Sequence, residues 1–100
     1  MQELENKIVL ITGGSKGIGY GVAEVLMREK MKIAITSRSQ KAAEAAAAKL
    51  NELGVGEAMG IGADVRDLSS QEKTVERVIQ RWGALDVLIA NAGIGYFGSI

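Results

Sequence analysis

The sequence predicts an α/β fold built on a doubly wound parallel sheet, with strand order 3-2-1-4 and three α/β/α layers. Short apolar segments alternate with segments of helical periodicity, which is typical of right-handed β-α-β crossovers. Several apolar segments are hydrophobic almost without interruption, as strands are when helices cover both faces of a sheet. A glycine-rich turn follows the first of them, where such a sheet reverses its winding.

Four apolar segments are predicted to form the strands. In chain order they are KIVLIT (7–12), KIAIT (32–36), AMGIGADV (58–65) and DVLIA (86–90). The first, second and fourth are apolar over almost their whole length, so we expect helices on both faces of the sheet. No proline, linker composition or internal repeat marks a second domain.

Three helices are predicted between the strands from apolar residues at helical spacing. The stripes are Ile18, Val22, Val25 and Leu26; Ala43, Ala46, Ala47, Leu50 and Leu53; and Val75, Val78, Ile79 and Trp82. The alanine run 45–48 indicates a small helix face that lies close to the sheet. Ser69 with Glu72 indicates a capping box for the third helix, and Gly54 is expected to end the second.

Composition and charge exclude several classes of function. The 100 residues are 47% hydrophobic and 24% charged, and 12 basic residues balance 12 acidic ones. Nothing in this balance indicates a nucleic-acid or anionic-membrane partner. The absence of Cys and His excludes disulfides, the usual zinc sites and His-dependent triads within these residues. No apolar segment is long enough to span a bilayer and no signal peptide follows Met1, so we expect a cytoplasmic protein.

The glycine-rich turn LITGGSKGIGYG (10–21) is the strongest functional signal in the chain. Gly13, Gly14, Gly17 and Gly19 fall between the first strand and the first helix. In a doubly wound sheet this turn brings bare backbone amides and the positive helix end to a nucleotide pyrophosphate. A tight turn without a ligand would need fewer glycines, so we predict a nucleotide site.

Two common nucleotide motifs do not fit this turn. Gly14 and Gly19 have P-loop spacing, but Tyr20 and Gly21 stand where Lys and Ser or Thr would be required, which argues against ATP hydrolysis. The G-x-G-x-x-G fingerprint fails because Val22 occupies its last glycine position. What remains is the spacing T-G-x-x-x-G-x-G over residues 12–19.

On these residues the chain resembles the classical short-chain dehydrogenase/reductase family, whose T-G-x-x-x-G-I-G motif is complete at 12–19. Asp64, followed by Val65, resembles the family's adenine-side acidic position. Residues 90–93 resemble its N-N-A-G motif, with Ala90 in place of the leading Asn. The resemblance implies a Rossmann-type fold and these candidate cofactor-binding residues: Thr12, Gly13, Ser15, Lys16, Gly17, Ile18, Gly19, Ser37, Arg38, Asp64, Val65, Asn91, Ala92 and Gly93.

The end of the second strand predicts NADP(H) rather than NAD as the cofactor. An NAD site usually offers a carboxylate about 20 residues past the glycines, to hold the ribose hydroxyls. Here the position reads Ser37-Arg38. A guanidinium fork suits the 2′-phosphate, and Lys16 adds a second positive charge. The resemblance supports this choice, since NADP-preferring members carry a basic residue at one or both positions.

The resemblance implies hydride transfer between nicotinamide and a carbonyl or alcohol carbon, with Ser, Tyr and Lys as catalytic residues. No Tyr-x-x-x-Lys is present, because Glu24 follows Tyr20 and Ile100 follows Tyr96 at that spacing. We therefore assign no catalytic residue within the chain. Residues 1–100 are expected to be the N-terminal part of a single NAD(P)-binding domain, with the strand 86–90 left at an edge.

Other readings of the same pattern remain open. The leading hypothesis is an NADP(H)-dependent reductase of 3-oxoacyl groups or other ketones, a homotetramer or homodimer when full length, with a small-molecule substrate. A Rossmann protein that senses a nucleotide without turnover is the alternative. A methyltransferase is disfavoured, because its site generally wants an acidic residue where Ser37 and Arg38 stand.

Overall fold

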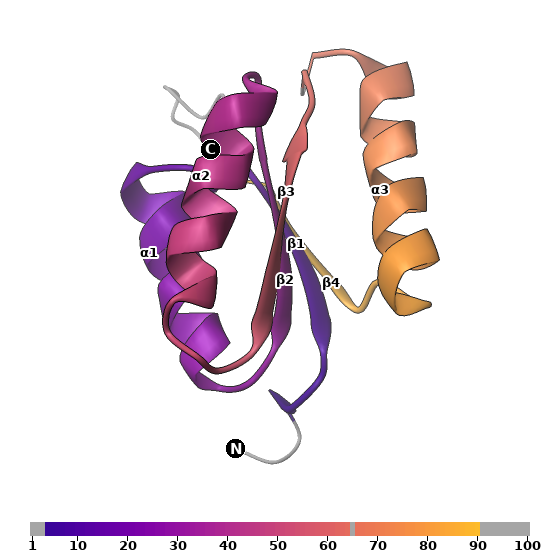
Figure 1. The fold of residues 1–100 in the computed structure, drawn as a ribbon. Coiled ribbons are helices and arrows are strands. Elements are labelled where there is room, and N and C mark those ends of the chain that lie inside the picture. Colours follow the sequence, from indigo (N-terminus) through magenta and orange to yellow (C-terminus); the bar gives the residue numbers. More distant parts are fainter. Residues whose placement is uncertain (1–3, 65, 91–100) are drawn as a thin grey trace.

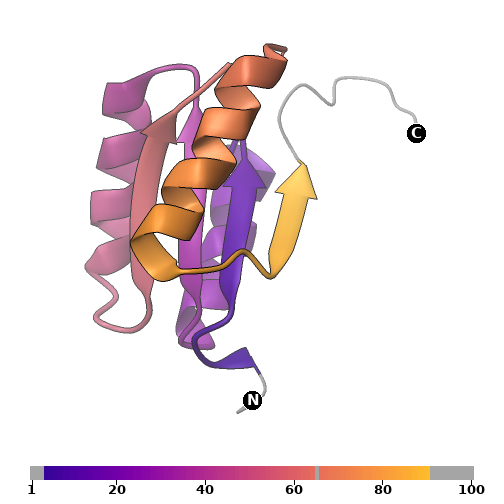
Figure 2. The same cartoon turned by 90° about the vertical axis from the view of Figure 1, so that its right-hand side faces the viewer.

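The computed structural model describes residues 4–64 and 66–90. Its elements, in order, are β1 (Ile8–Thr12), α1 (Gly17–Arg28), β2 (Lys32–Ser37), α2 (Gln40–Asn51), β3 (Glu57–Gly62), α3 (Leu68–Trp82) and β4 (Val87–Ala90). Every strand pair is parallel and the sheet order is β3-β2-β1-β4, which confirms the predicted topology (Figure 2).

The sheet lies between two helical layers, as predicted. Figure 1 shows α1 and α2 on one face of the sheet and α3 on the other. Alternate residues of β1 serve the two layers: Val9 and Ile11 pack with α1 and α2, whereas Ile8 and Leu10 pack with Val78 of α3. The near-continuous apolar run of β1 is explained by this burial on both sides.

The alanine-rich helix α2 lies directly on the sheet, which confirms the interpretation of the run 45–48. Its inward residues Ala43, Ala46, Ala47 and Leu50 are buried. The closest approach is at Gly60 of β3, where an added Cβ would collide with the backbone carbonyl of Ala43. Small residues on both sides therefore set the distance between α2 and the sheet.

The face that α1 turns to the sheet differs from the predicted one. Ile18 is 79% exposed and Val25 is 62% exposed, whereas Gly19, Ala23 and Met27 are buried. The helix is rotated so that Gly19, Ala23 and Met27 face the core, and Val22 and Leu26 pack partly buried beside them. Only half of the predicted stripe therefore contacts the core.

The ends of two helices also correct the sequence prediction. The cap of α3 is Asp67, whose side chain accepts a hydrogen bond from the Ser69 amide at 3.0 Å. Ser69 lies inside the helix, so the predicted capping box is wrong. Asp is as good a cap as Ser and stands two residues earlier. Helix α2 ends at Asn51, and Gly54, with φ +76°, follows after a further turn.

β3 ends earlier than its predicted range, and β4 lies at the edge of the described sheet. β3 ends at Gly62 and not at residue 65, although the Ala63 amide still donates to the Ser37 carbonyl at 2.8 Å. Within the described residues β4 has one neighbour, β1, and its Val87 and Leu88 are 43% and 56% exposed. The prediction that this strand lies at an edge is confirmed for the described part of the chain.

Candidate functional site

The glycine turn is fastened to the end of β2 by a single residue. The Gly13 amide donates to the Thr36 side-chain oxygen at 3.1 Å, and the Gly14 amide donates to the Thr36 carbonyl at the same distance. Thr36 is 1% exposed and Gly14 is buried, whereas Gly13 is half-buried. These two amides are thereby engaged inside the protein.

Three of the glycines are required by local geometry. A Cβ on Gly14 would lie 2.7 Å from Cγ2 of Ile35, so any side chain there would push the turn away from β2. Gly17 has φ +65° in open surroundings and lets the chain turn into α1. Gly13 is left-handed as well, with φ +72°. The close contact at Gly14 and the two left-handed residues together explain why the turn is rich in glycine.

Helix α1 begins without a side-chain cap, unlike the other two described helices. Its N-cap is Lys16, in an extended conformation and with no capping hydrogen bond, whereas Ser39 caps α2 and Asp67 caps α3. The first amides of a helix need acceptors from outside it, and the helix dipole adds partial positive charge there. The start of α1 therefore suits an anionic group.

The remaining candidates in the turn differ in exposure. Thr12 ends β1, and Ser15 is half-buried. Lys16 and Ile18 project from the exposed start of α1, whereas Gly19 is buried against the sheet. Because the Ile18 side chain is exposed, it does not pack in the core. Its place in the motif depends on its backbone position at the start of α1.

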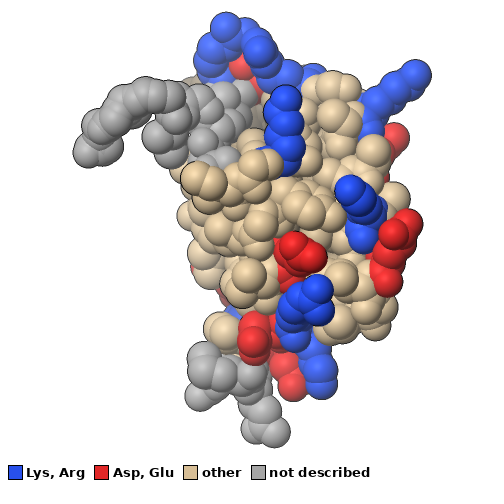
Figure 3. Space-filling view, turned by 90° about the vertical axis from the view of Figure 1, so that its left-hand side faces the viewer, with Lys and Arg blue, Asp and Glu red and all other residues tan. Residues whose placement is uncertain are grey.

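The end of β2 carries the two residues predicted to choose the cofactor. The Ser37 hydroxyl accepts from the Ser39 amide at 3.3 Å. Arg38 is exposed and forms no ion pair with the described residues. Figure 3 shows basic side chains gathered at the upper rim of the molecule, the edge at which the strands end in Figure 2. The described end of β2 offers a guanidinium and a hydroxyl, and no carboxylate.

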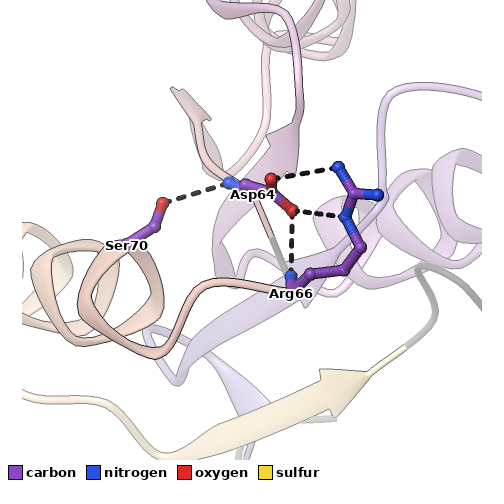
Figure 4. A network of polar contacts seen from close by, with 3 residues as sticks. All are labelled: Asp64, Arg66 and Ser70. Carbon is purple, nitrogen blue, oxygen red and sulfur yellow. Dashed lines mark hydrogen bonds and ion pairs between the residues drawn. The ribbon is translucent and has the colours of Figure 1, made fainter.

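Asp64 lies at the same edge, just past β3, and is held by two neighbours. Its amide donates to the Ser70 hydroxyl at 3.0 Å, which ties it to the first turns of α3. Its Oδ1 accepts from the Arg66 amide at 2.9 Å and from Nε at 3.2 Å, while Oδ2 accepts from Nη2 at 3.3 Å (Figure 4). The Asp64–Arg66 ion pair is a fork of two side-chain contacts.

These contacts lower the pKa of the Asp64 carboxyl. The hydrogen bonds from Arg66 lower the pKa of the Asp64 carboxyl below its ordinary value, and the charge of Arg38 lowers it further. The same pair raises the pKa of Arg66.

The ends of β1 and β4 complete the described part of this edge. Thr12 is paired in register with Ala90, so the glycine turn starts beside the end of β4. A hollow of about 220 Å³ lies there, between the sheet and α3. It is lined by Leu10, Thr12, Thr36, Ala63, Gln71, Thr74, Val75, Leu88 and Ala90. Of the sequence candidates, Val65, Asn91, Ala92 and Gly93 lie outside the described residues.

Sequence reasoning missed three residues that build this edge. Thr36 reads as an ordinary β-former in an apolar strand, and only its register beside the turn reveals its role. Gln40 accepts from the Gly62 amide at 2.6 Å and donates to the Gly60 carbonyl at 3.4 Å. Arg66 stands two residues after an acidic candidate, a spacing that could have suggested the pair.

Tyr20 packs partly buried against the core and lines a surface hollow with Ser15, Lys16 and Gly17 of the glycine turn. No group of three or more potential metal ligands occurs in residues 4–64 and 66–90. In that same part of the chain, every helix is too short or too polar to cross a membrane.

The comparisons with known proteins agree on one family. A profile of the family described as short chain dehydrogenase matches residues 7–100. The 3-oxoacyl-(acyl-carrier-protein) reductase FabG of Vibrio harveyi is 40% identical over 91 residues, which are 91% of this chain and 36% of that protein.

Solved structures give the same result. A short chain dehydrogenase from Mycobacterium smegmatis has a TM-score of 0.87 at 28% identity, covering 93% of this chain and 38% of that one. A 3-ketoacyl-(acyl-carrier-protein) reductase from Brucella melitensis, complexed with NADH, has a TM-score of 0.76 at 29% identity, covering 85% and 34%. This chain thus spans less than two-fifths of the length of these relatives.

Proposed function

This chain belongs to the short chain dehydrogenase family, and we propose that it supplies the cofactor-binding part of an NADP(H)-dependent oxidoreductase. The bound cofactor exchanges a hydride with a carbonyl or alcohol carbon of a small substrate. The similarity to FabG of Vibrio harveyi favours a ketone reductase of the 3-oxoacyl type. Residues 1–100 form the N-terminal part of one Rossmann domain in this proposal.

The start of α1 fits the pyrophosphate of such a cofactor. Gly13 and Gly14 are engaged with Thr36, so the amides that remain for an anion belong to the uncapped first turn of α1. The helix dipole and Lys16 both favour negative charge at this point. The residues of the turn would thus bind the diphosphate by backbone donors and hold it at the end of β1.

Arg38 is the observation that carries the choice of NADP(H). The reductase from Brucella melitensis was solved with NADH, so family membership leaves the choice between the two cofactors open. At the described end of β2 the exposed residue Arg38 forms no ion pair with the described residues, and the Asp64 carboxylate just past β3 is paired with Arg66. A ribose 2′-phosphate would gain a charge-assisted hydrogen bond from Arg38, whereas the described end of β2 carries no carboxylate to accept from a ribose 2′-hydroxyl.

A titration of the full-length protein tests this choice. We expect Arg38→Asp to weaken NADPH binding about tenfold to a hundredfold, the value of one charge-assisted hydrogen bond, and to strengthen NADH binding. Arg77→Asp makes the same change of charge on the exposed body of α3 and serves as the control. Unchanged NADPH affinity in Arg38→Asp would show that the 2′-phosphate is bound elsewhere or is absent.

A turnover assay distinguishes the proposed oxidoreductase from the alternative, a protein that senses a nucleotide without turnover. Proton transfer must accompany hydride transfer, and residues 1–100 contain no Tyr-x-x-x-Lys to perform it. We therefore propose that the proton-transfer residues lie outside these hundred positions. The full-length protein should oxidise NADPH with a 3-oxoacyl thioester or a simple ketone. Tight NADPH binding without oxidation by any of a broad panel of ketones would favour the sensor.

A further inference from the structure

Arg66 controls the orientation of the Asp64 carboxylate in this structure. Three of its donors reach that carboxylate: the backbone amide at 2.9 Å, Nε at 3.2 Å and Nη2 at 3.3 Å. The main chain on the other side is fixed as well, because the Asp64 amide is held by Ser70. The two carboxylate oxygens are therefore oriented by the Arg66 backbone amide together with its guanidinium (Figure 4).

The Asp64 carboxylate can accept one more hydrogen bond on Oδ2 than the described residues supply. An ionised carboxylate has two oxygens and about four lone-pair positions. Oδ1 accepts from two donors of Arg66 and Oδ2 accepts from one. One position on Oδ2 thus remains for a further donor. The Asp64 side chain is 40% exposed, so a ligand at this edge of the sheet can reach it.

We propose that Arg66 is a positioning residue for the adenine end of the cofactor, holding Asp64 so that Oδ2 faces the exocyclic amino group. The proposal rests on the proposed function, which brings a dinucleotide to this edge. It extends that function to a residue that does not itself contact the cofactor. The fork holds the carboxylate plane, and the hydrogen bonds from Arg66 lower the pKa of the Asp64 carboxyl, as does the Arg38 charge to a smaller extent.

The test combines one substitution with one change in the cofactor. NADPH and its hypoxanthine analogue differ at the base, where an oxygen replaces the amino donor. In the full-length protein we expect Arg66→Ala to weaken NADPH binding about threefold to tenfold, the range of one ordinary hydrogen bond. The same substitution should leave the affinity for the hypoxanthine analogue unchanged, because that analogue has no amino group to place.

Two further variants separate positioning from charge and from general stability. Lys cannot form the planar fork, so Arg66→Lys should bind NADPH as weakly as Arg66→Ala. Full rescue by Lys would overturn positioning in favour of a simple charge effect. Arg81→Ala removes an arginine of comparable exposure that pairs with Glu57 at the other end of β3, and it should leave NADPH binding unchanged.

Each contrary outcome has a separate meaning. Equal losses for NADPH and its hypoxanthine analogue, with none for NADH, would assign Arg66 to the phosphate and overturn the proposal. Tighter binding by Arg66→Ala would show that the guanidinium competes with adenine, which also overturns it. If the protein prefers NADH, the choice of NADP(H) fails. The Arg66 test then runs unchanged with NADH and its hypoxanthine analogue, since both cofactors carry the same adenine.

Discussion

The side-chain oxygen of Thr36 and the amide of Gly13 form a 3.1 Å hydrogen bond that joins β2 to the glycine turn. The two residues are 23 positions apart, yet the parallel pairing of β1 with β2 brings them together. The position of the turn thus depends on a neighbouring strand as well as on its own glycines.

Thr36→Val should destabilise the protein while preserving the shape of the buried side chain. We expect the free energy of unfolding to fall by about 1–3 kcal/mol, because the Gly13 amide loses this buried acceptor. Thr36→Ser keeps the hydroxyl and should cost only about 0.8 kcal/mol for the lost methyl group. Urea unfolding measures both, and a Val variant as stable as the wild type would show that the bond contributes nothing.

Gly60→Ala should displace α2 from the sheet. Its Cβ would collide with the Ala43 carbonyl and would lie 2.7 Å from the Glu44 amide nitrogen, and backbone atoms cannot rotate away. We expect a loss of about 1–3 kcal/mol or more, as for other overpacked sites. Gly21→Ala is the control, since no atom lies within 4 Å of its Cβ and a helical Ala gains roughly 0.5–1 kcal/mol over Gly. Equal stability of the two variants would contradict this packing.

Glu57 should make stability depend on pH below its ordinary pKa. The hydrogen bond from Arg81, at 2.7 Å, lowers the pKa of Glu57 from 4.5 in the folded protein. Its contribution is therefore complete above pH 4.5 and is lost as the pH falls through the lowered value. Both side chains are more than one-third exposed, so the pair contributes at most about 1 kcal/mol. Unfolding curves should show Glu57→Gln less stable than wild type at pH 7 and equal to it at low pH; a pH-independent gap would refute the assignment.

The polypeptide of residues 1–100 alone should associate and should not turn over substrate. Among the described residues β4 pairs on one side only and exposes Leu88, an arrangement that invites further strands. We expect light scattering to show association at micromolar concentration, reduced by Leu88→Lys but not by Gln80→Lys on α3. NADPH oxidation with ketones should be absent. A monodisperse, active preparation would contradict both expectations.

The topology could be predicted from the sequence because it depends on strong and simple signals. Uninterrupted apolar runs, helical spacing and the glycine turn were enough to give the parallel order β3-β2-β1-β4. The face of α1 was mistaken because apolar periodicity favours Ile18 and Val25, while close packing selects Gly19 and Ala23. The hydrophobic pattern alone does not give the distance between a helix and its sheet.

Site residues whose chemical type suggests their role could be predicted from the sequence. Residues whose role depends on a hydrogen bond to another part of the site could not. The positions of Ser37 and Arg38 at the end of β2 and of Asp64 just past β3 follow from the strand pattern. The fork from Arg66 and the Thr36 acceptor depend on side-chain directions that no local pattern specifies. The roles of all these residues toward a cofactor remain predictions.

The pairing of β4 with β1 has a consequence for the order of events during translation. The Ile8 amide bonds to the Asp86 carboxylate at 2.9 Å, across 78 positions of the chain. Closing so long a loop is slow compared with joining β1, β2 and β3, which are separated by single crossovers. On the ribosome those three strands, with α1 and α2, are synthesised well before β4 emerges. The glycine turn and its hydrogen bond to Thr36 can therefore form early. The edge of β1 that pairs with β4 stays accessible to chaperones until β4 has been synthesised.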